Sequence, residues 1–395
     1  MVRRSRVHSR DLQPQIVAPK GLFAVARVQR FDFPLTINTT DIDEIGRRLH
    51  VGTTSDIPDI AVTFEAFDVS HNTFAYMTGY TPGTFPASGA SITELKNVDI
   101  LGQIKTAGGS NVVNAIYVKR GITTGMDATF GVRDNSTVSY TVSANSKKQF
   151  RNPVFVDSGT LATSSGGLTL TNTPVYLTRT SGYTINAYRT GTDGSTNYLN
   201  EGTDYTVAGT AVSFTGTSTV AGDVVWVSYT SAATGSFLAL NDVDAAAVQG
   251  KYVPLKISLT NIPRVQSATI RVAFESEQIL EMGGLGRPVG YEVGIPSVTG
   301  DVSVLKTDND LLSILEGNVG STAENDIEFA ATDLPLKIQL KDPRNPDRTL
   351  LTYYVPSITI TAHGDEDTVN ASMNETFSWK STTGEMFVAS GVGPW

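Results

Sequence analysis

The amino-acid sequence repeats itself once, and this internal repeat limits the possible folds more than any other feature. A shift of 237 residues superimposes these identities without a gap: Arg27, Val28, Gln29, Glu44 and Gly46 on Arg264, Val265, Gln266, Glu281 and Gly283. With one inserted residue, the match continues as Val51, Gly52, Ile57, Pro58 and Gly79 on Val289, Gly290, Ile295, Pro296 and Gly317. Five identities in the first twenty positions exceed the roughly one in fifteen expected by chance.

The repeat divides the 395 residues into four parts. We predict a first copy over residues 22–160 and a second copy over residues 245–395, because the closing FVDSG of the first matches the closing FVASG of the second. Residues 161–244 lie between the copies and form a third unit. Residues 1–21 precede them as a basic N-terminal arm.

Each copy is predicted to be mainly β-strand with one short helix. Apolar and polar residues alternate over 31–37 and 62–67, the period that sends successive side chains to opposite faces of a sheet. A helix is expected over 70–77, where Ser70 is a suitable N-cap and Gly79 a suitable end, and its counterpart over 308–316.

A long connection separates the first two predicted strands of each copy. It spans residues 41–57 in the first copy and 278–295 in the second, and both segments are rich in Gly, Asp and Arg. Connections of this length are usually functional or disordered.

The middle unit, 161–244, reads as a small β-sandwich. Five alternating segments, TPVYLTR, GYTINAYR, DYTV, TAVSFTG and DVVWVSYT, are separated by turn residues at the spacing of short sandwich strands. The architecture is immunoglobulin-like, but the chain has no cysteine and therefore lacks the disulfide of immunoglobulin domains. Trp226 is predicted to be a core residue.

Charge is distributed unevenly along the chain. Residues 1–30 hold seven Lys and Arg against one Asp, a sum of +6, which leaves −15 for the rest of a chain with net charge −9. An acidic body argues against binding nucleic acid through phosphate contacts. The basic arm either docks on an acidic neighbour or is a solvated terminus. We find no apolar run that would serve as a signal sequence or membrane span.

The sequence contains no arrangement that predicts catalysis, a cofactor or a metal. Four histidines are scattered, and none lies four residues from another as two ligands of one metal on a helix would. Phosphate-binding and nucleophile-elbow motifs are absent. The acidic run at 365–367 lacks the ligand spacing of a calcium loop. We therefore predict a protein that is not an enzyme.

The segment EIGRRLHVGTTSDIPDIAVTFEAFDVSHNTFAYMTG at 44–79 resembles the tail tube proteins of long-tailed bacteriophages. Its more diverged counterpart is EMGGLGRPVGYEVGIPSVTGDVSVLKTDNDLLSILEG at 281–317. The resemblance implies an all-β fold of two tandem tail-tube-type domains, each with one short helix, plus an inserted immunoglobulin-like β-sandwich. It further implies a structural virion protein, assembled in the host cytoplasm, that has tape measure and other tail proteins as partners.

In that family, six domains form a ring, and stacked rings form a tube that conducts genomic DNA without binding it specifically. Two fused domains per chain then imply a ring of three chains with pseudo-six-fold symmetry. If each domain lends four strands, 24 strands spaced about 4.8 Å and tilted about 40° close at a diameter of roughly 45 Å, which admits duplex DNA.

A wall along which DNA slides should offer no cations that grip phosphates. Polar or acidic residues without Lys or Arg occupy the expected inward faces, and these are our lumen-facing candidates: Thr63, Glu65, Asp301, Ser303, Thr137, Ser139, Thr141, Asn370, Ser372 and Asn374. An ordinary solvent-facing sheet would show the same alternation. In the family the long loops join successive rings, and the corresponding candidates are Asp41, Asp43, Arg47, Arg48 and Arg287.

A second hypothesis, from a different class, is a surface adhesin or glycan-binding protein in which the middle sandwich supplies the binding site. The tube subunit is the leading hypothesis and the adhesin is its chief rival. A third hypothesis, a polysaccharide hydrolase, would require a pair of carboxylates separated suitably in space.

Overall fold

The structure is a computed structural model. It describes residues 11–18, 21–37, 39–42, 52–55, 58–67, 71–80, 85–95, 97–106, 109–178, 181–192, 195–240, 247–258, 260–279, 290–305, 333–366 and 373–395. Of these residues, 64% lie in strands, which pair in large antiparallel sheets, and only 4% are helical, so the predicted all-β class is confirmed.

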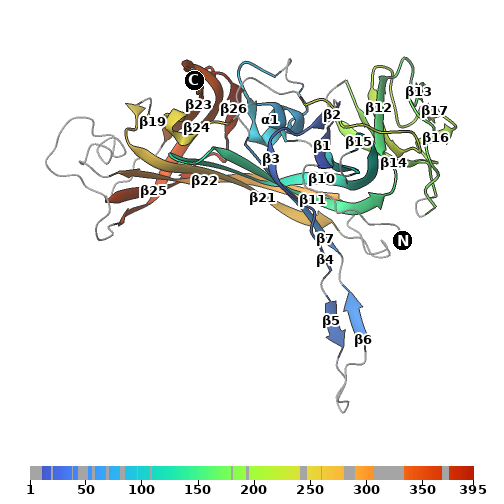
Figure 1. Cartoon of the computed structure of the whole chain (residues 1–395), viewed down its shortest axis with the longest axis horizontal. Coiled ribbons are helices and arrows are strands. Elements are labelled where there is room, and N and C mark those ends of the chain that lie inside the picture. Colours follow the sequence, from blue (N-terminus) through green and yellow to red (C-terminus); the bar gives the residue numbers. More distant parts are fainter. Residues whose placement is uncertain are drawn as a thin grey trace, which may run out of the picture.

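Eight strands, four from each copy, form one continuous sheet that runs across the molecule in Figure 1. We call it the shared sheet. Its strands, in spatial order, are β3 (Val28–Asp32, extended by β4, Leu35–Thr36), β7 (Asp59–Ala66), β11 (Thr137–Phe150), β10 (Val112–Gly131), β21 (Val265–Ile279), β22 (Gly290–Leu305), β25 (Asn374–Ser381) and β24 (Asn345–Glu366). The order is the same in both halves, with β3, β7, β11 and β10 equivalent to β21, β22, β25 and β24.

The repeat extends to irregularities at the start of the sheet. Arg27 and Arg264 both adopt the left-handed conformation, with φ of 57° and 59°. In both copies the glutamine two residues later interrupts the strand register, and its Nε2 donates to the carbonyl of that arginine at 3.1 Å. Left-handed backbone is uncommon for residues other than glycine, so its recurrence at equivalent sites indicates a common local design.

A second irregularity recurs in the long strands. The register of β10 with β11 shifts at Thr124, and that of β24 with β25 shifts at Thr361, 237 residues later. Each threonine hydroxyl donates to the backbone of the neighbouring strand, at Thr141 (3.4 Å) and Ser378 (3.2 Å). Both register shifts therefore occur at equivalent positions in the two copies.

A second layer of strands covers one face of the shared sheet in each copy. The long strands β10 and β24 continue beyond the sheet and pair with β9 (Val98–Lys105) and β23 (Leu334–Asp342). The layer is completed by β1 (Leu12–Ala18) and β2 (Gly21–Ala24) in the first copy, and by β19 (Leu255–Ile257), β20 (Thr260–Asn261) and β26 (Phe387–Ser390) in the second. One apolar core spans both copies, which also meet where β8 (Ala90–Ser91) pairs with β26.

The basic arm predicted at 1–21 is only partly correct. Residues 1–10 lie outside the described residues, but β1 is a core strand in which Ile16, Val17 and Ala18 are fully buried. The Lys and Arg residues assigned to the arm lie before or after this strand in the sequence. The net charge of residues 1–30 therefore gave no indication of the apolar segment between them.

The predicted helix of the first copy is confirmed as α1 (Asn72–Met77), which ends before Gly79, where φ is 81°. Phe74 and Met77 are buried in the core. The N-cap of α1 is His71, which makes no capping hydrogen bond through its side chain, so the expectation of Ser70 as the N-cap was wrong. Ser70 and the helix expected at 308–316 lie outside the described residues. Short 3₁₀ turns occupy Ile92–Glu94 and Gly250–Tyr252.

The middle unit is a sandwich of a four-stranded and a three-stranded sheet. We call it the inserted unit. The first sheet has the order β12 (Val154–Thr160), β18 (Val224–Thr230), β14 (Thr184–Thr190) and β15 (Thr196–Leu199), and the second β13 (Gly167–Thr169), β17 (Ala211–Phe214) and β16 (Tyr205–Ala208). Four of the five predicted segments contain strands, whereas TPVYLTR makes only isolated bridges.

The match of FVDSG with FVASG was wrong as a structural equivalence. β12 pairs with β18 and so belongs to the inserted unit, whereas β26 pairs with β24 and β8. The boundary expected at residue 160 therefore moves to about residue 153. The chain has returned to the first copy by Gly235, which bridges to Val112.

The inserted unit is docked on the first copy through an interface with an apolar and a polar part. Trp226, Tyr188 and Ile185 form one buried cluster with Val17 and Leu101, so Trp226 is buried as predicted, but between the units rather than inside the sandwich.

At the centre of this interface lies the buried carboxylate of Asp99. Its Oδ2 accepts from Tyr117 Oη (2.5 Å) and from Asn186 Nδ2 (2.6 Å), and its Oδ1 accepts from the backbone N–H of Arg120 (2.7 Å). The Tyr117 hydroxyl is also 2.9 Å from Ser228 Oγ. Burial raises the pKa of Asp99, although these hydrogen bonds act to lower it.

We expect Tyr117→Phe to destabilise the folded chain by about 1–3 kcal/mol, because a buried carboxylate loses a donor. Urea denaturation followed by tryptophan fluorescence measures this, since Trp226 reports on the interface. An unchanged midpoint would show that the bond contributes nothing.

The raised pKa of Asp99 also predicts a pH dependence. The native state binds this proton more tightly than the unfolded chain, so its contribution to stability falls as the pH rises from the ordinary value of 3.8 through the raised pKa. Asp99→Asn should remove this component from the stability profile measured between pH 4 and 7. A profile of the same slope in both proteins contradicts the assignment.

Copy-specific packing is clearest at one cross-strand pair. In the second copy Gly300 lies opposite Trp379, and the equivalent pair in the first copy is Val62 opposite Val142. A Cβ at Gly300 would lie 2.5 Å from the Trp379 ring and 2.0 Å from the Thr269 carbonyl oxygen. The two copies thus fill equivalent space with different side chains: a glycine and a tryptophan in the second copy, and two valines in the first.

We expect Gly300→Val alone to cost about 2–3 kcal/mol through overpacking, and Trp379→Val alone about 3 kcal/mol through a cavity. The double variant, which installs the pair of the first copy, should lose at least about 1 kcal/mol less than the sum of the singles. Additive losses in denaturant titrations would contradict this account.

Candidate functional site: the polar face of the shared sheet

The face of the shared sheet turned away from the core carries polar side chains, and we call it the polar face. Alternate residues of each strand are buried, so the residues between them share this face. Its members are Arg30 and Asp32 on β3, Thr63 and Glu65 on β7, Thr137, Ser139 and Thr141 on β11, Asp127 and Thr129 on β10, Thr269 and Arg271 on β21, Thr299, Asp301 and Ser303 on β22, and Thr376, Ser378 and Lys380 on β25.

The structure brings most of the lumen-facing candidates together on this one face. Glu65 lies directly opposite Ser139, and Thr63 lies opposite Thr141. The candidates of the second copy, Asp301, Ser303 and Asn374, lie on the adjoining strands β22 and β25. Asn370 and Ser372 lie outside the described residues.

Sequence reasoning missed the middle of the face, which β10 and β21 supply. Thr129 lies opposite Thr269, and Asp127 lies opposite Arg271, so these pairs join the two copies. Alternation in GMDATFG and SATIRVA was a usable signal for the strands. It could not show that the two strands are neighbours, because their pairing is between copies.

The expectation that this surface lacks cations was wrong. Arg30, Arg271 and Lys380 lie on it, and all three are exposed. Arg30 Nε is 2.5 Å from Asp32 Oδ2, and Arg271 Nη1 is 3.4 Å from Asp301 Oδ2. Because a carboxylate compensates each arginine, these two residues add little net positive charge to the face.

Asp301 is the best-connected carboxylate of the face. It accepts hydrogen bonds from Ser378 Oγ (2.8 Å) and Thr269 Oγ1 (3.3 Å), and thereby links three adjacent strands. Asp127, across the junction, has its pKa raised by partial burial, while the charge of Arg271 acts in the opposite direction.

The face carries mainly hydroxyl groups, two arginines that are paired with carboxylates, and the exposed Lys380. Within the described ranges, no group of three or more His, Asp and Glu side chains is placed to hold a metal ion.

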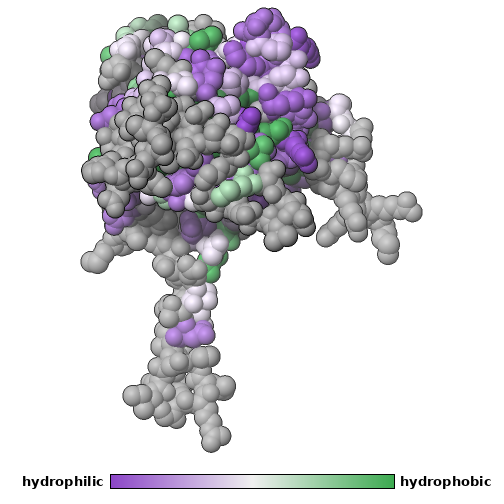
Figure 2. Space-filling view, turned by 90° about the vertical axis from the view of Figure 1, so that its left-hand side faces the viewer, coloured by the Kyte–Doolittle hydropathy of each residue, from purple (hydrophilic) through white to green (hydrophobic). Residues whose placement is uncertain are grey.

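Two extensions of the shared sheet correspond to the long connections predicted in each copy. In the first copy β5 (Thr39–Ile42) and β6 (Gly52–Ser55) form a hairpin that projects from the body (Figures 1 and 2). Asp41 lies in this hairpin and accepts a hydrogen bond from Thr53 Oγ1 at 3.1 Å. The other loop candidates, Asp43, Arg47, Arg48 and Arg287, lie outside the described residues.

In the second copy the ends of β21 and β22 pair beyond the body of the sheet and expose apolar side chains. Ile279 and Val293 are about half exposed, and Ile295 is 81% exposed. Exposed apolar residues gathered on one extension are typical of a contact surface.

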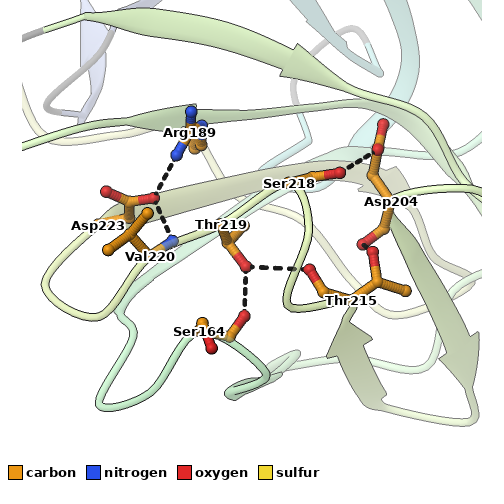
Figure 3. Close-up of polar contacts among 8 residues, drawn as sticks. All are labelled: Ser164, Arg189, Asp204, Thr215, Ser218, Thr219, Val220 and Asp223. Carbon is orange, nitrogen blue, oxygen red and sulfur yellow. Dashed lines mark hydrogen bonds and ion pairs between the residues drawn. The ribbon is translucent and has the colours of Figure 1, made fainter.

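The inserted unit carries its own polar contacts, which hold its turns (Figure 3). Asp223 Oδ2 accepts from Arg189 Nη1 and from the Val220 backbone N–H, each at 2.8 Å. Ser218 Oγ donates to Asp204, and this bond lowers the pKa of that carboxyl. These carboxylates are engaged in holding the unit together.

Comparisons with protein-family models and with curated proteins find no match to this chain. Among the helices of the described segments, none has both the length and the apolar character to cross a membrane.

Proposed function

We propose that the chain is a structural subunit of a phage tail tube, in which copies join side by side so that the polar face lines a passage for DNA. The observation that carries the proposal is the shared sheet, in which two equivalent four-stranded units are joined edge to edge. A unit that can pair with its own copy inside one chain can pair in the same way between chains.

Strand number supports a closed ring. Each chain contributes eight strands to the shared sheet, so three chains would supply the 24 strands for which a diameter of roughly 45 Å is expected. Three chains and six equivalent units would give pseudo-six-fold symmetry.

The polar face suits a passage through which a polyanion slides. Hydroxyl groups offer weak, exchangeable hydrogen bonds, and the two arginines paired with carboxylates offer less attraction to phosphate than free cations would. Each chain then presents a further exposed cation on this face, Lys380. DNA would then be confined without being held.

The inserted unit lies on the opposite side from the polar face. It packs against Val17 and Leu101 of the covering layer, so in a ring it would decorate the exterior and leave the passage open. The sheet extensions would contact adjacent rings, and tape measure and other tail proteins would be further partners.

The adhesin hypothesis has one observation in its favour. Tyr176 and Tyr183 of the inserted unit are both substantially exposed, and their rings meet edge to face with centroids 5.1 Å apart. An exposed aromatic pair offers a platform for an amphipathic ligand such as a sugar ring.

Negative-stain microscopy of the concentrated protein distinguishes the two functions. A tube subunit forms rings or stacked tubes, whereas an adhesin stays monomeric and binds members of a glycan array. A persistent monomer that binds glycans would contradict the tube proposal.

We expect Glu65→Lys to leave tube assembly intact and to lower genome delivery by about tenfold or more, because a cation replaces a carboxylate on the face that DNA passes. The measurement is infectious titre per assembled particle. Asp347→Lys, at an exposed position near the start of β24 and away from the polar face, makes a similar charge change elsewhere and serves as the control. Normal titre from the Glu65 variant would contradict the lumen assignment.

A further inference from the structure

The shared sheet has two open edges, one at each end of the chain's strand order. Among the described residues, β3 and β4 pair only with β7, and the last part of β24, from Thr359 to Glu366, pairs only with β25. Open edges present unpaired backbone N–H and C=O groups and are templates for another strand.

The pairing of the two copies within one chain indicates which strand each open edge can bind. At this junction β10 and β21 pair directly over seven positions, from Gly125 opposite Ala273 to Gly131 opposite Ser267. β24 is the equivalent of β10, and β3 with β4 is the equivalent of β21, as their shared bulges establish. The open edge of β24 and the open edge of β3 and β4 are therefore equivalent to the two strand edges that pair at the junction.

We propose that the open edge of β24 binds the β3–β4 edge of a second copy of this chain, in the register of the internal junction. Transferring that register by 237 residues places Ala362 opposite Thr36, His363 opposite Leu35, and Gly364 opposite Pro34. The inference rests on the tube proposal and specifies its contact between chains, which we call the seam.

Burial at equivalent positions supports a missing partner. Val272 at the junction is 2% exposed, whereas its equivalent Leu35 at the open edge is 49% exposed. Ile37, two residues further on, is 51% exposed. A second copy placed as at the junction would cover this apolar surface, which a monomer leaves in water.

Two substitutions distinguish the seam from the junction. Beneath the junction lie Met126 and Val138, both buried and apolar. Their equivalents at the seam are His363 and Glu375, whose Nε2 and Oε1 are 2.8 Å apart, and His363 is 17% exposed. The junction forms once, on folding, whereas the seam edge must remain soluble until a partner arrives, and inward-pointing charged groups protect such edges.

The absence of cysteine makes the register directly testable by engineered disulfides. Residues directly opposite in an antiparallel pair have Cα atoms about 4.5–5.5 Å apart, within the disulfide range of about 4.4–6.8 Å. An offset of two residues increases the separation beyond that range.

The test variant is Thr36→Cys with Ala362→Cys, oxidised under assembly conditions and run on a non-reducing gel. We expect covalent multimers that end at the trimer, formed at least about tenfold more than in the slipped variant Thr36→Cys with Gly364→Cys. A Cβ at Gly364 meets no atom within 4 Å, so the slipped variant should fold.

The internal control is Gly125→Cys with Ala273→Cys, which should close within one chain. A Cβ at Gly125 makes only ordinary contacts, at 3.5 Å or more. Tubes in which the slipped pair cross-links as well as the matched pair would overturn the seam register while leaving the tube proposal intact. Absence of both multimers and tubes, with the internal control formed, would overturn both.

Discussion

Main-chain pairing between β10 and β21 is the interaction on which the rest of the structure depends. It converts two four-stranded sheets into one, makes their cores continuous, and brings their polar faces into a single surface. Without it, each copy would expose two edges, and the chain would carry four in place of two. The same pairing determines which edges stay open and what they can accept.

The two copies share the strand bulges that the pairing of β10 with β21 requires, and they differ in the side chains at other positions. Bulges at Gln29 and Gln266, and at Thr124 and Thr361, recur because they set strand twist and register. Side-chain volumes are free to change in compensating pairs, as Gly300 with Trp379 shows. At the open edge His363 and Glu375 replace the apolar Met126 and Val138, and there the environment before assembly is water and not the other copy.

Sequence reasoning recovered the repeat, the all-β class, α1 and four strands of the inserted unit, because alternation and identity are local signals. It failed where the outcome depends on spatial neighbours. β1 is short and lies among cations, so the charge total hid it, and FVDSG resembles FVASG although its backbone pairs with a different sheet. Asp99 could not be predicted as buried, because only the docked unit supplies Asn186 as a donor.

The candidate site was predicted in part for the same reason. Thr63, Glu65 and Asp301 share a face because period-two alternation fixes the face within each strand. The contributions of β10 and β21, with Arg271, follow from the contact between copies, which no local pattern encodes.

The mass of the smallest closed ring tests the central claim most directly. Native mass spectrometry of assembled particles should give three chains of 42.2 kDa, a total of about 127 kDa, with averaged images showing six lobes. A ring of six chains, or a monomer at every concentration, would contradict the claim that each chain supplies two equivalent units of one wall.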